Sequence, residues 1–300
     1  MLEKKLIAIV GPTASGKTTL AISLAQKFGG EIVSADSRQI YRGMDIGTAK
    51  PTADERGAVP HHLIDIRDPD EDYTVADYQR DAIAAINDII ARGKLPFLVG
   101  GTGLYVRAVV ENLDIPKMAA DPKLRAEIES EIARDGLDAA FKKLLALDPD
   151  AADVVDPKNP RRVVRALEVA LATGKPFIAQ RKKNEPLFDA LALGLDPPPE
   201  TLRERIDRRI DAMMRDGLVD EVRALVAKYG VDAPALSAIG YREIIAYIEN
   251  KTSIDDAVAT IKLNTWHYAK RQMTWFKKYR PAYWPDGEHA AGTLVEHFLS

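Results

Sequence analysis

Short apolar runs alternate with longer amphipathic stretches over the first hundred positions of the chain. Three of these runs have the length and composition of buried strands: residues 6–10, 32–35 and 95–99. Two stretches repeat their apolar residues at helical spacing: residues 19–28 and 75–91. Because strands that alternate with helices usually form parallel pairs, the pattern predicts an α/β fold with a parallel sheet.

Less regular segments separate and follow these elements. Residues 43–60 are rich in Gly and Thr and predict a polar loop, and residues 62–66 predict a short strand. Towards the end of the chain, a helical pattern extends to about Tyr279, and a last helix is expected near 288–299.

The pattern changes after about Asn112. Residues 121–183 contain helical segments and no convincing strand, which predicts a helical insertion. A strand-like run returns over 190–195, and the prolines within 196–200 mark a boundary before the next helix. We therefore expect two domains, a core made of residues 1–112 and 188–300 and an insertion made of residues 113–187.

The turn between the first strand and the first helix carries a phosphate-binding motif. Its residues match the pattern G-x-x-x-x-G-K-[ST]: Gly11, Pro12, Thr13, Ala14, Ser15, Gly16, Lys17 and Thr18. The two glycines let backbone N–H groups converge on phosphate oxygens, Lys17 adds a positive charge, and the Thr18 hydroxyl can bind Mg²⁺. The motif predicts a nucleotide-binding or other diphosphate site on a P-loop NTPase-like core.

Asp36 is the candidate catalytic carboxylate, because it follows the strand-like run 32–35. The run 95–99 ends in two glycines instead of the aspartate that most P-loop ATPases carry there. Ligands of parallel sheets bind at the carboxyl ends of the strands, so Asp36 would face an acceptor and act as its base. The alternative is an aspartate that caps a turn, since Ser37 follows it directly.

Composition limits the classes of function. The 300 residues include no cysteine, which excludes a disulfide framework, a thiol nucleophile and a cysteine-ligated metal, and which fits a reducing compartment. No apolar run approaches the ~18 residues of a membrane span. A cytoplasmic protein without membrane contact is therefore expected.

Positive charge is concentrated in two stretches of a chain whose net charge is −3. Residues 158–183 hold eight Lys or Arg against Glu168 alone, and residues 257–285 hold six and no acid. Such stretches suit a polyanion that is bound locally, but they also occur as solvated faces of helices.

Several long motifs resemble one family almost without a break. They are Asp36-Ser37-Arg38-Gln39-Ile40-Tyr41, Asp45-Ile46-Gly47-Thr48-Ala49-Lys50-Pro51, Gly100-Gly101-Thr102-Gly103-Leu104-Tyr105 and Ala238-Ile239-Gly240-Tyr241-Arg242-Glu243. Together with the phosphate loop and Ala269-Lys270-Arg271-Gln272, they resemble the tRNA dimethylallyltransferases, also called tRNA isopentenyltransferases. The resemblance covers nearly the whole chain, and it is to the bacterial type, because the zinc-binding extension of eukaryotic members is absent.

The resemblance implies a reaction and a set of site residues. The reaction moves the dimethylallyl group of dimethylallyl diphosphate to N6 of the adenine next to the anticodon, on its 3′ side, with Mg²⁺ as cofactor. The implied catalytic residues are Lys17, Thr18, Asp36 and Arg209. The implied contacts with the tRNA anticodon stem-loop are Asp36, Ser37, Arg38, Gln39, Thr102, Arg125, Arg161, Arg162, Arg165, Gly240, Tyr241 and Arg242. A monomer is expected.

Three other functions share some of these features. A P-loop small-molecule kinase would bind ATP at the loop and use Asp36 to deprotonate a hydroxyl group. An adenylate prenyltransferase would act on a free nucleotide, although such enzymes are smaller and lack the basic insertion. A non-catalytic RNA-binding P-loop protein would have no use for Lys17, Thr18 and Asp36.

Overall fold

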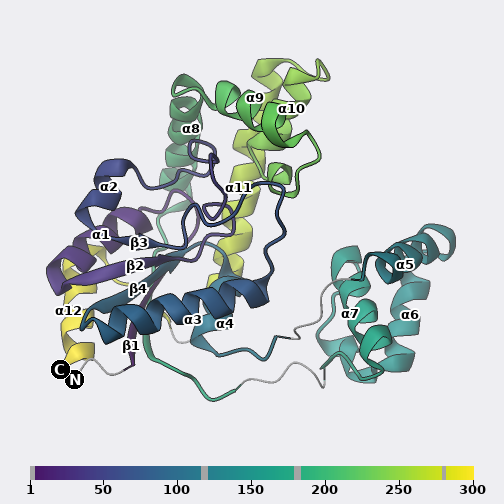
Figure 1. Cartoon of the computed structure of the whole chain (residues 1–300), viewed down its shortest axis with the longest axis horizontal. Coiled ribbons are helices and arrows are strands. Elements are labelled where there is room, and N and C mark those ends of the chain that lie inside the picture. The colour runs from purple at the N-terminus through teal and green to yellow at the C-terminus, as the bar shows by residue number, and fades with distance from the viewer. Residues whose placement is uncertain (1–3, 116–120, 179–183, 279–281) are drawn as a thin grey trace. The chain divides into compact units, whose positions relative to one another are not determined.

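The computed structural model describes residues 4–115, 121–178, 184–278 and 282–300. The chain divides into two compact units, one made of Met1–Val110 with Pro186–Ser300 and one made of Glu111–Glu185. These limits lie two residues before the domain boundaries predicted from the sequence. Figure 1 shows the sheet and its helices in the larger unit, and the helices of the smaller unit in teal.

The larger unit is built on a parallel sheet that contains six strands among the described residues. The strand order is β3-β2-β4-β1-β5-β6, and every neighbouring pair is parallel. The strands are β1 (Lys5–Val10), β2 (Gly30–Ser34), β3 (His61–His62), β4 (Leu95–Gly100), β5 (Asp189–Gly194) and β6 (Ala282–Tyr283). The α/β fold with a parallel sheet that the sequence predicts is therefore confirmed.

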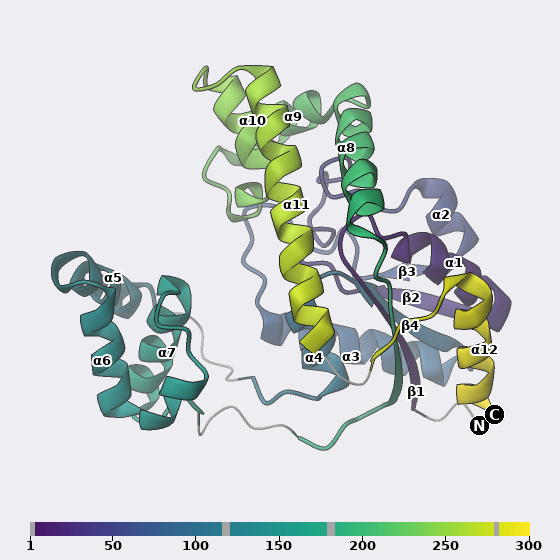
Figure 2. The same ribbon diagram turned by 180° about the vertical axis from the view of Figure 1, so that it is seen from behind.

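Helices cover both faces of this sheet, as Figures 1 and 2 show from opposite sides. On one face, α1 (Lys17–Phe28) and α12 (Gly287–Leu299) pack against the odd-numbered positions of β1. On the other face, α3 (Val75–Ala91) and α4 (Gly103–Val110) pack against its even-numbered positions. Because successive side chains of a strand point to opposite faces, an unbroken apolar strand such as β1 must be covered on both sides.

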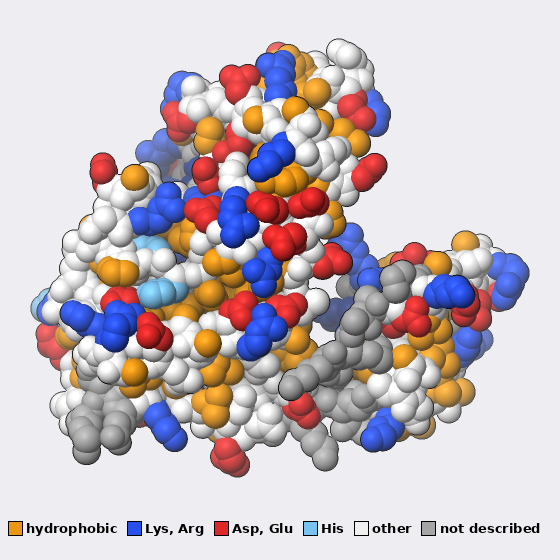
Figure 3. Space-filling view, viewed as in Figure 1, with side chains coloured by type: hydrophobic (Ala, Val, Ile, Leu, Met, Phe, Trp, Pro, Cys, Tyr) orange, Lys and Arg blue, Asp and Glu red, His pale blue; other side chains and the backbone are white. Residues whose placement is uncertain are grey.

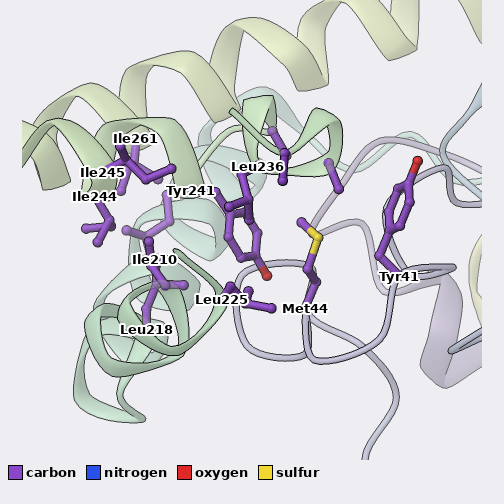
Figure 4. Close-up of a cluster of buried hydrophobic side chains, with 14 of the residues drawn as sticks. Tyr41, Met44, Ile210, Leu218, Leu225, Leu236, Tyr241, Ile244, Ile245 and Ile261 are labelled. Atoms are coloured by element: carbon purple, nitrogen blue, oxygen red, sulfur yellow. The ribbon is translucent and has the colours of Figure 1, made fainter. Parts of the chain in front are cut away.

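A second apolar core lies among the C-terminal helices of the larger unit. These helices are α8 (Pro199–Arg215), α9 (Leu218–Tyr229), α10 (Tyr241–Ile248) and α11 (Ile254–Lys278), with a 3₁₀ turn at Pro234–Ser237. Figure 4 shows Tyr241, Leu225 and Met44 within this cluster. The loop that contains Met44 is thereby fixed to helices nearly two hundred residues later in the chain.

The structure differs from two predictions for the segment between β2 and α3. The polar loop predicted over 43–60 contains the helix α2 (Ala53–Ala58), which begins with a capping box between Thr52 and Glu55. The strand predicted over 62–66 is limited to His61–His62, because Leu63 takes a φ of 61° and leaves the extended region. The Thr-x-x-Glu signature of the capping box was readable in the sequence.

The smaller unit is helical throughout the part of it that the structure describes. It contains α5 (Pro122–Asp135), α6 (Leu137–Leu147), a 3₁₀ turn at Pro149–Asp153 and α7 (Pro160–Thr173). Its own core includes Ile128, Leu144, Val163 and Leu167. A separate core of this kind is what a domain needs to hold its shape.

Charged side chains of both signs are interspersed with apolar ones on the face of the larger unit that Figure 3 presents. Within the described ranges, no helix combines the length and the apolar character needed to cross a membrane.

Candidate active site

The phosphate loop joins β1 to α1 in the strand–turn–helix arrangement that the motif predicts. Gly16 caps α1 with a φ of 93°, in the left-handed region that glycine enters without strain. The first N–H groups of α1 have no partner within the helix and are therefore available to an anion. Lys17 donates from Nζ to the Pro12 carbonyl at 2.9 Å, which folds its ammonium group back over the loop.

The charge on Lys17 responds to its surroundings. Burial lowers the pKa of Lys17 to about 8, the negative charge of Asp36 opposes this shift, and the positive charge of Arg209 adds to it. The structure thus brings Lys17, Asp36 and Arg209, three of the four predicted catalytic residues, within electrostatic range of one another. The fourth, Thr18, is the next residue of α1.

Arginines of α8 line the phosphate loop from one side. Arg209 donates from Nη1 to the Thr13 hydroxyl at 3.4 Å, and burial lowers its pKa. Arg205 donates from Nη1 to the Ser15 carbonyl at 3.3 Å. These two and Arg208 share a pocket of about 680 Å³ with Ala14, Ser15 and Gly16 of the loop. The predicted set contained Arg209 but omitted Arg205 and Arg208, although spacings of three and four residues placed the three arginines on one helix face.

Asp36 follows β2, and its two carboxylate oxygens have different surroundings. Oδ1 accepts the backbone N–H of Arg38 at 2.8 Å, which is the turn-capping role considered as the alternative for this residue. Among the residues that the structure describes, no hydrogen bond occupies Oδ2. The capping bond therefore fixes the carboxylate and leaves one oxygen able to accept a proton.

Thr102 lies beside Asp36, on the loop that follows β4. Its Oγ1 accepts the backbone N–H of Ser37 at 3.1 Å and donates to the Ser37 hydroxyl at 3.3 Å. The Thr102 backbone N–H donates to the Ala35 carbonyl at 3.1 Å. Tyr268 of α11 completes this group, because burial and the negative charge of Asp36 raise its pKa to about 12. The predicted site set omitted Tyr268.

The side chain of Gln39 is engaged by the protein itself. Its Oε1 accepts from the Ser34 hydroxyl at 3.1 Å, and its Nε2 donates to the carbonyls of Thr48 and Ala49. Arg38 extends from the same turn, and its Nη1 donates to the Ala235 carbonyl at 3.5 Å. The structure thus brings the predicted residues 36–39 together, with the Gln39 amide occupied within the fold.

A carboxylate that the sequence did not single out holds the next loop. Glu221 of α9 accepts the backbone N–H groups of Asp45, Ile46 and Gly47 at 3.0, 2.7 and 3.1 Å. It also accepts the hydroxyl of Tyr241 at 2.7 Å. Four donors on one carboxylate make Glu221 the anchor of this loop.

This arrangement changes the interpretation of the predicted segment 240–242. The side chain of Tyr241 is 0% exposed, so it packs in the core. Gly240 has a φ of 96° and begins α10, and the exposed Arg242 donates from Nε to Glu243 at 2.7 Å. Within this segment, Arg242 is the side chain that the structure presents to solvent.

The basic residues of the smaller unit differ in their engagement. Arg161 and Arg162 are exposed at the start of α7. Arg165 instead donates to the fully buried Glu168 at 2.9 Å, and Arg125 of α5 pairs with Glu129 at 3.5 Å. Three further basic residues of the predicted stretch lie outside the described residues, namely Arg181, Lys182 and Lys183.

The sequence predicts that the Thr18 hydroxyl, at the end of the phosphate loop, binds Mg²⁺. The described residues contain no group of three or more His, Cys, Asp or Glu that could hold a metal ion by themselves. A cation at Thr18 would therefore take most of its oxygen ligands from a diphosphate and from water. Mg²⁺ binds in this way, with few protein ligands and several waters or phosphate oxygens.

The fold and site define a P-loop α/β protein in which the phosphate loop after β1 and the Asp36 carboxylate after β2 lie within electrostatic range of each other, with β4 between the two strands. The chain matches the family described as IPP transferase over residues 39–279. It belongs to this family.

Relatives of known name support the same assignment. The chain is 50% identical to a tRNA dimethylallyltransferase of Roseiflexus sp. (strain RS-1), with 98% of each chain covered. It is 49% identical to a tRNA dimethylallyltransferase of Shouchella clausii, covering 100% of this chain and 98% of the relative.

Solved structures are similar as well. A full-length tRNA isopentenylpyrophosphate transferase from Bacillus halodurans aligns with a TM-score of 0.73 and 42% identity, over 99% of this chain and 95% of that one. A eukaryotic dimethylallyltransferase acting on tRNA aligns with a TM-score of 0.75 and 33% identity, over 91% of this chain and 69% of that one.

Proposed function

We propose that this chain transfers the dimethylallyl group of dimethylallyl diphosphate to N6 of the tRNA adenine next to the anticodon, on its 3′ side. The products are N6-(dimethylallyl)adenosine and diphosphate. The observation that carries this proposal is that Asp36, a proton acceptor with one open oxygen, lies within electrostatic range of Lys17 in the phosphate loop. The relatives named tRNA dimethylallyltransferase supply the substrate class.

The donor diphosphate would bind at the phosphate loop. The N–H groups at the start of α1 would donate to its oxygens, and Lys17 and Arg209 would neutralise its charge. This charge neutralisation matters for the rate, because the C1–O bond of the donor breaks as the diphosphate leaves with the bonding electrons. Mg²⁺ bound at the Thr18 hydroxyl would add to the stabilisation of the leaving group.

The acceptor adenine would meet Asp36. The N6 amine is a weak nucleophile because its lone pair is delocalised into the ring, so it must lose a proton as the C–N bond forms. The open Oδ2 of Asp36 would take that proton while the backbone N–H of Arg38 holds Oδ1. The adenine must leave its base stack to reach this carboxylate, and an exposed anticodon loop lowers the cost of extrusion.

Exposed basic groups would hold the tRNA backbone. Arg161 and Arg162 in the smaller unit are exposed and available for phosphate contacts. Arg125, Arg165 and Arg242 would contribute less, since each already pairs with an acid. We further propose that the protein acts as a monomer in the cytoplasm, where unmodified tRNA is available.

Prenyl transfer and phosphoryl transfer can be separated in one experiment. Unmodified tRNA is incubated with labelled dimethylallyl diphosphate and Mg²⁺, and ATP hydrolysis is measured in parallel. We expect label in tRNA that depends on Mg²⁺ and that Asp36→Ala abolishes without loss of tRNA binding. Phosphoryl transfer from ATP with no label in tRNA would favour the kinase alternative, which the relatives do not support.

A further inference from the structure

Gln272 of α11 connects two loops of the active site through one buried amide group. The residue is buried, with 7% of its surface exposed. Oε1 accepts the backbone N–H of Thr13 in the phosphate loop at 2.9 Å, and Nε2 donates to the carbonyl of Gly101 after β4, also at 2.9 Å. Reversing the amide would place oxygen against a carbonyl and NH₂ against an N–H, so the two partners fix its orientation.

Each partner of Gln272 belongs to a loop that holds a residue with a proposed role in the reaction. We call the phosphate loop the donor loop, and the loop of Gly101 and Thr102 after β4 the acceptor loop. Thr13 belongs to the donor loop, and its hydroxyl contacts Arg209. Gly101 precedes Thr102, which holds the backbone of Ser37 beside the proposed base Asp36. The amide of Gln272 is therefore a bridge from the donor loop to the acceptor loop.

The close approach of the two groups also explains the glycine at position 101. A Cβ atom there would lie 2.3 Å from Nε2 of Gln272, which is closer than any real contact. The carbonyl and the amide can meet only because Gly101 has no side chain. The bridge thus requires both the buried amide of Gln272 and the glycine at position 101.

We propose that Gln272 is a positioning residue that sets the separation between the donor loop and the acceptor loop. This inference rests on the proposed function, because the separation matters only if a group passes from one loop to the other. Reacting atoms must be held about 3–3.5 Å apart, so a small displacement of either loop lowers the rate of transfer. Gln272 acts through Thr13 and Gly101 and touches neither substrate.

The main test replaces the amide by an apolar side chain of similar length. Gln272→Met should lower kcat about 10-fold to 100-fold, because the loops are no longer held together. The KM values for dimethylallyl diphosphate and for tRNA should each stay within about threefold, because the groups that bind each substrate are retained. A purely structural role of Gln272 would lower stability without lowering kcat of the folded protein.

Gln79→Met is the matched control. Gln79 also donates from Nε2 to a backbone carbonyl, that of Ala108 at 2.7 Å, and this bond joins α3 to α4. The two variants therefore undergo the same replacement, and only Gln272→Met should lose kcat. Equal losses of kcat in both variants would overturn the inference, as would a folded Gln272→Met protein with wild-type kcat.

A second pair of variants disturbs the bridge from the opposite side and covers the case in which Gln272→Met does not fold. Gly101→Ala should lower kcat by displacing the Gln272 amide. Adding Gln272→Ala makes room for the new methyl group, so the double variant should lose no more kcat than Gln272→Ala alone. Fully multiplicative losses would overturn the inference.

Failure of the inference and failure of the proposed function give different results. An inactive wild-type protein in the prenyl transfer assay would overturn the proposed function and this inference with it. An active wild-type protein beside a Gln272→Met variant of unchanged kcat would overturn the inference alone.

Discussion

The backbone N–H of Ser37 donates to Oγ1 of Thr102 at 3.1 Å and so links the loops that follow β2 and β4. These two strands are neighbours in the sheet, although they are separated by more than sixty residues in the chain. The bond fixes the residue next to Asp36, so the orientation of the proposed base depends on a hydroxyl group from another loop.

Replacing this hydroxyl should impair catalysis more than folding. Thr102→Val keeps the shape of the side chain and leaves the Ser37 N–H without its acceptor, which costs about 1–3 kcal/mol. If that cost falls on the active arrangement, kcat/KM for tRNA should drop about 10-fold to 100-fold. Thr102→Ser retains the acceptor and should recover most of the activity in the labelled prenyl transfer assay. Equal activities of the two variants would show that the hydroxyl is dispensable.

The lowered pKa of Lys17 predicts a pH limit for donor binding. The ammonium form binds the diphosphate, and with a pKa of about 8 this form predominates below pH 8 and is lost above it. In the free protein, kcat/KM for dimethylallyl diphosphate should therefore fall as pH rises through about 8, approaching tenfold per pH unit. Lys17→Arg keeps its charge to much higher pH, so its residual activity should lack this limb. A flat wild-type profile from pH 7 to 9.5 would contradict the assignment.

Two buried tyrosines offer a comparison of hydrogen bonds to charged and neutral acceptors. Tyr241 donates to the Glu221 carboxylate at 2.7 Å, and Tyr78 donates to the Ser34 carbonyl at 3.0 Å. Both side chains are 0% exposed. Tyr241→Phe should lower the free energy of unfolding by about 1.5–3 kcal/mol and Tyr78→Phe by about 1 kcal/mol. Urea denaturation of both variants measures the difference, and a larger loss for Tyr78→Phe would rule out this role of Glu221.

The parts of the fold that depend on local signals could be predicted from the sequence. The helix expected over 75–91 has those bounds in the structure, because its apolar residues follow helical spacing and Thr74 with Asp77 forms a capping box at its start. The phosphate loop is likewise a local motif. Its turn is specified by Gly16 and the residues next to it in the sequence.

The parts that depend on distant partners could not be predicted. Glu221 lies 176 residues beyond Asp45, whose N–H it accepts, and Gln272 lies 259 residues beyond Thr13. Gln272 stands in one of the segments that carry the family resemblance, but no local pattern identifies the loops that Gln272 and Glu221 contact. The burial of Tyr241, where the sequence predicts a tRNA contact, likewise depends on distant partners, because its core is formed with the Met44 loop.

Two arginines three positions apart on α7 should separate RNA affinity from stability. Arg162 is exposed, whereas Arg165 donates to the buried carboxylate of Glu168 at 2.9 Å. Arg162→Ala should leave the free energy of unfolding unchanged and weaken tRNA binding. It should also reduce the slope of log K against log salt by about 1, the value for one lost phosphate contact.

Arg165→Ala should have the opposite profile. It leaves Glu168 with the Asp121 N–H as its remaining hydrogen bond among the described residues, so the smaller unit should lose about 1–3 kcal/mol of stability. Binding measured at several salt concentrations, together with urea denaturation, distinguishes the two roles. If Arg162→Ala changed neither the affinity nor the salt slope, Arg162 would contact no phosphate, and the RNA surface of this unit would have to lie elsewhere.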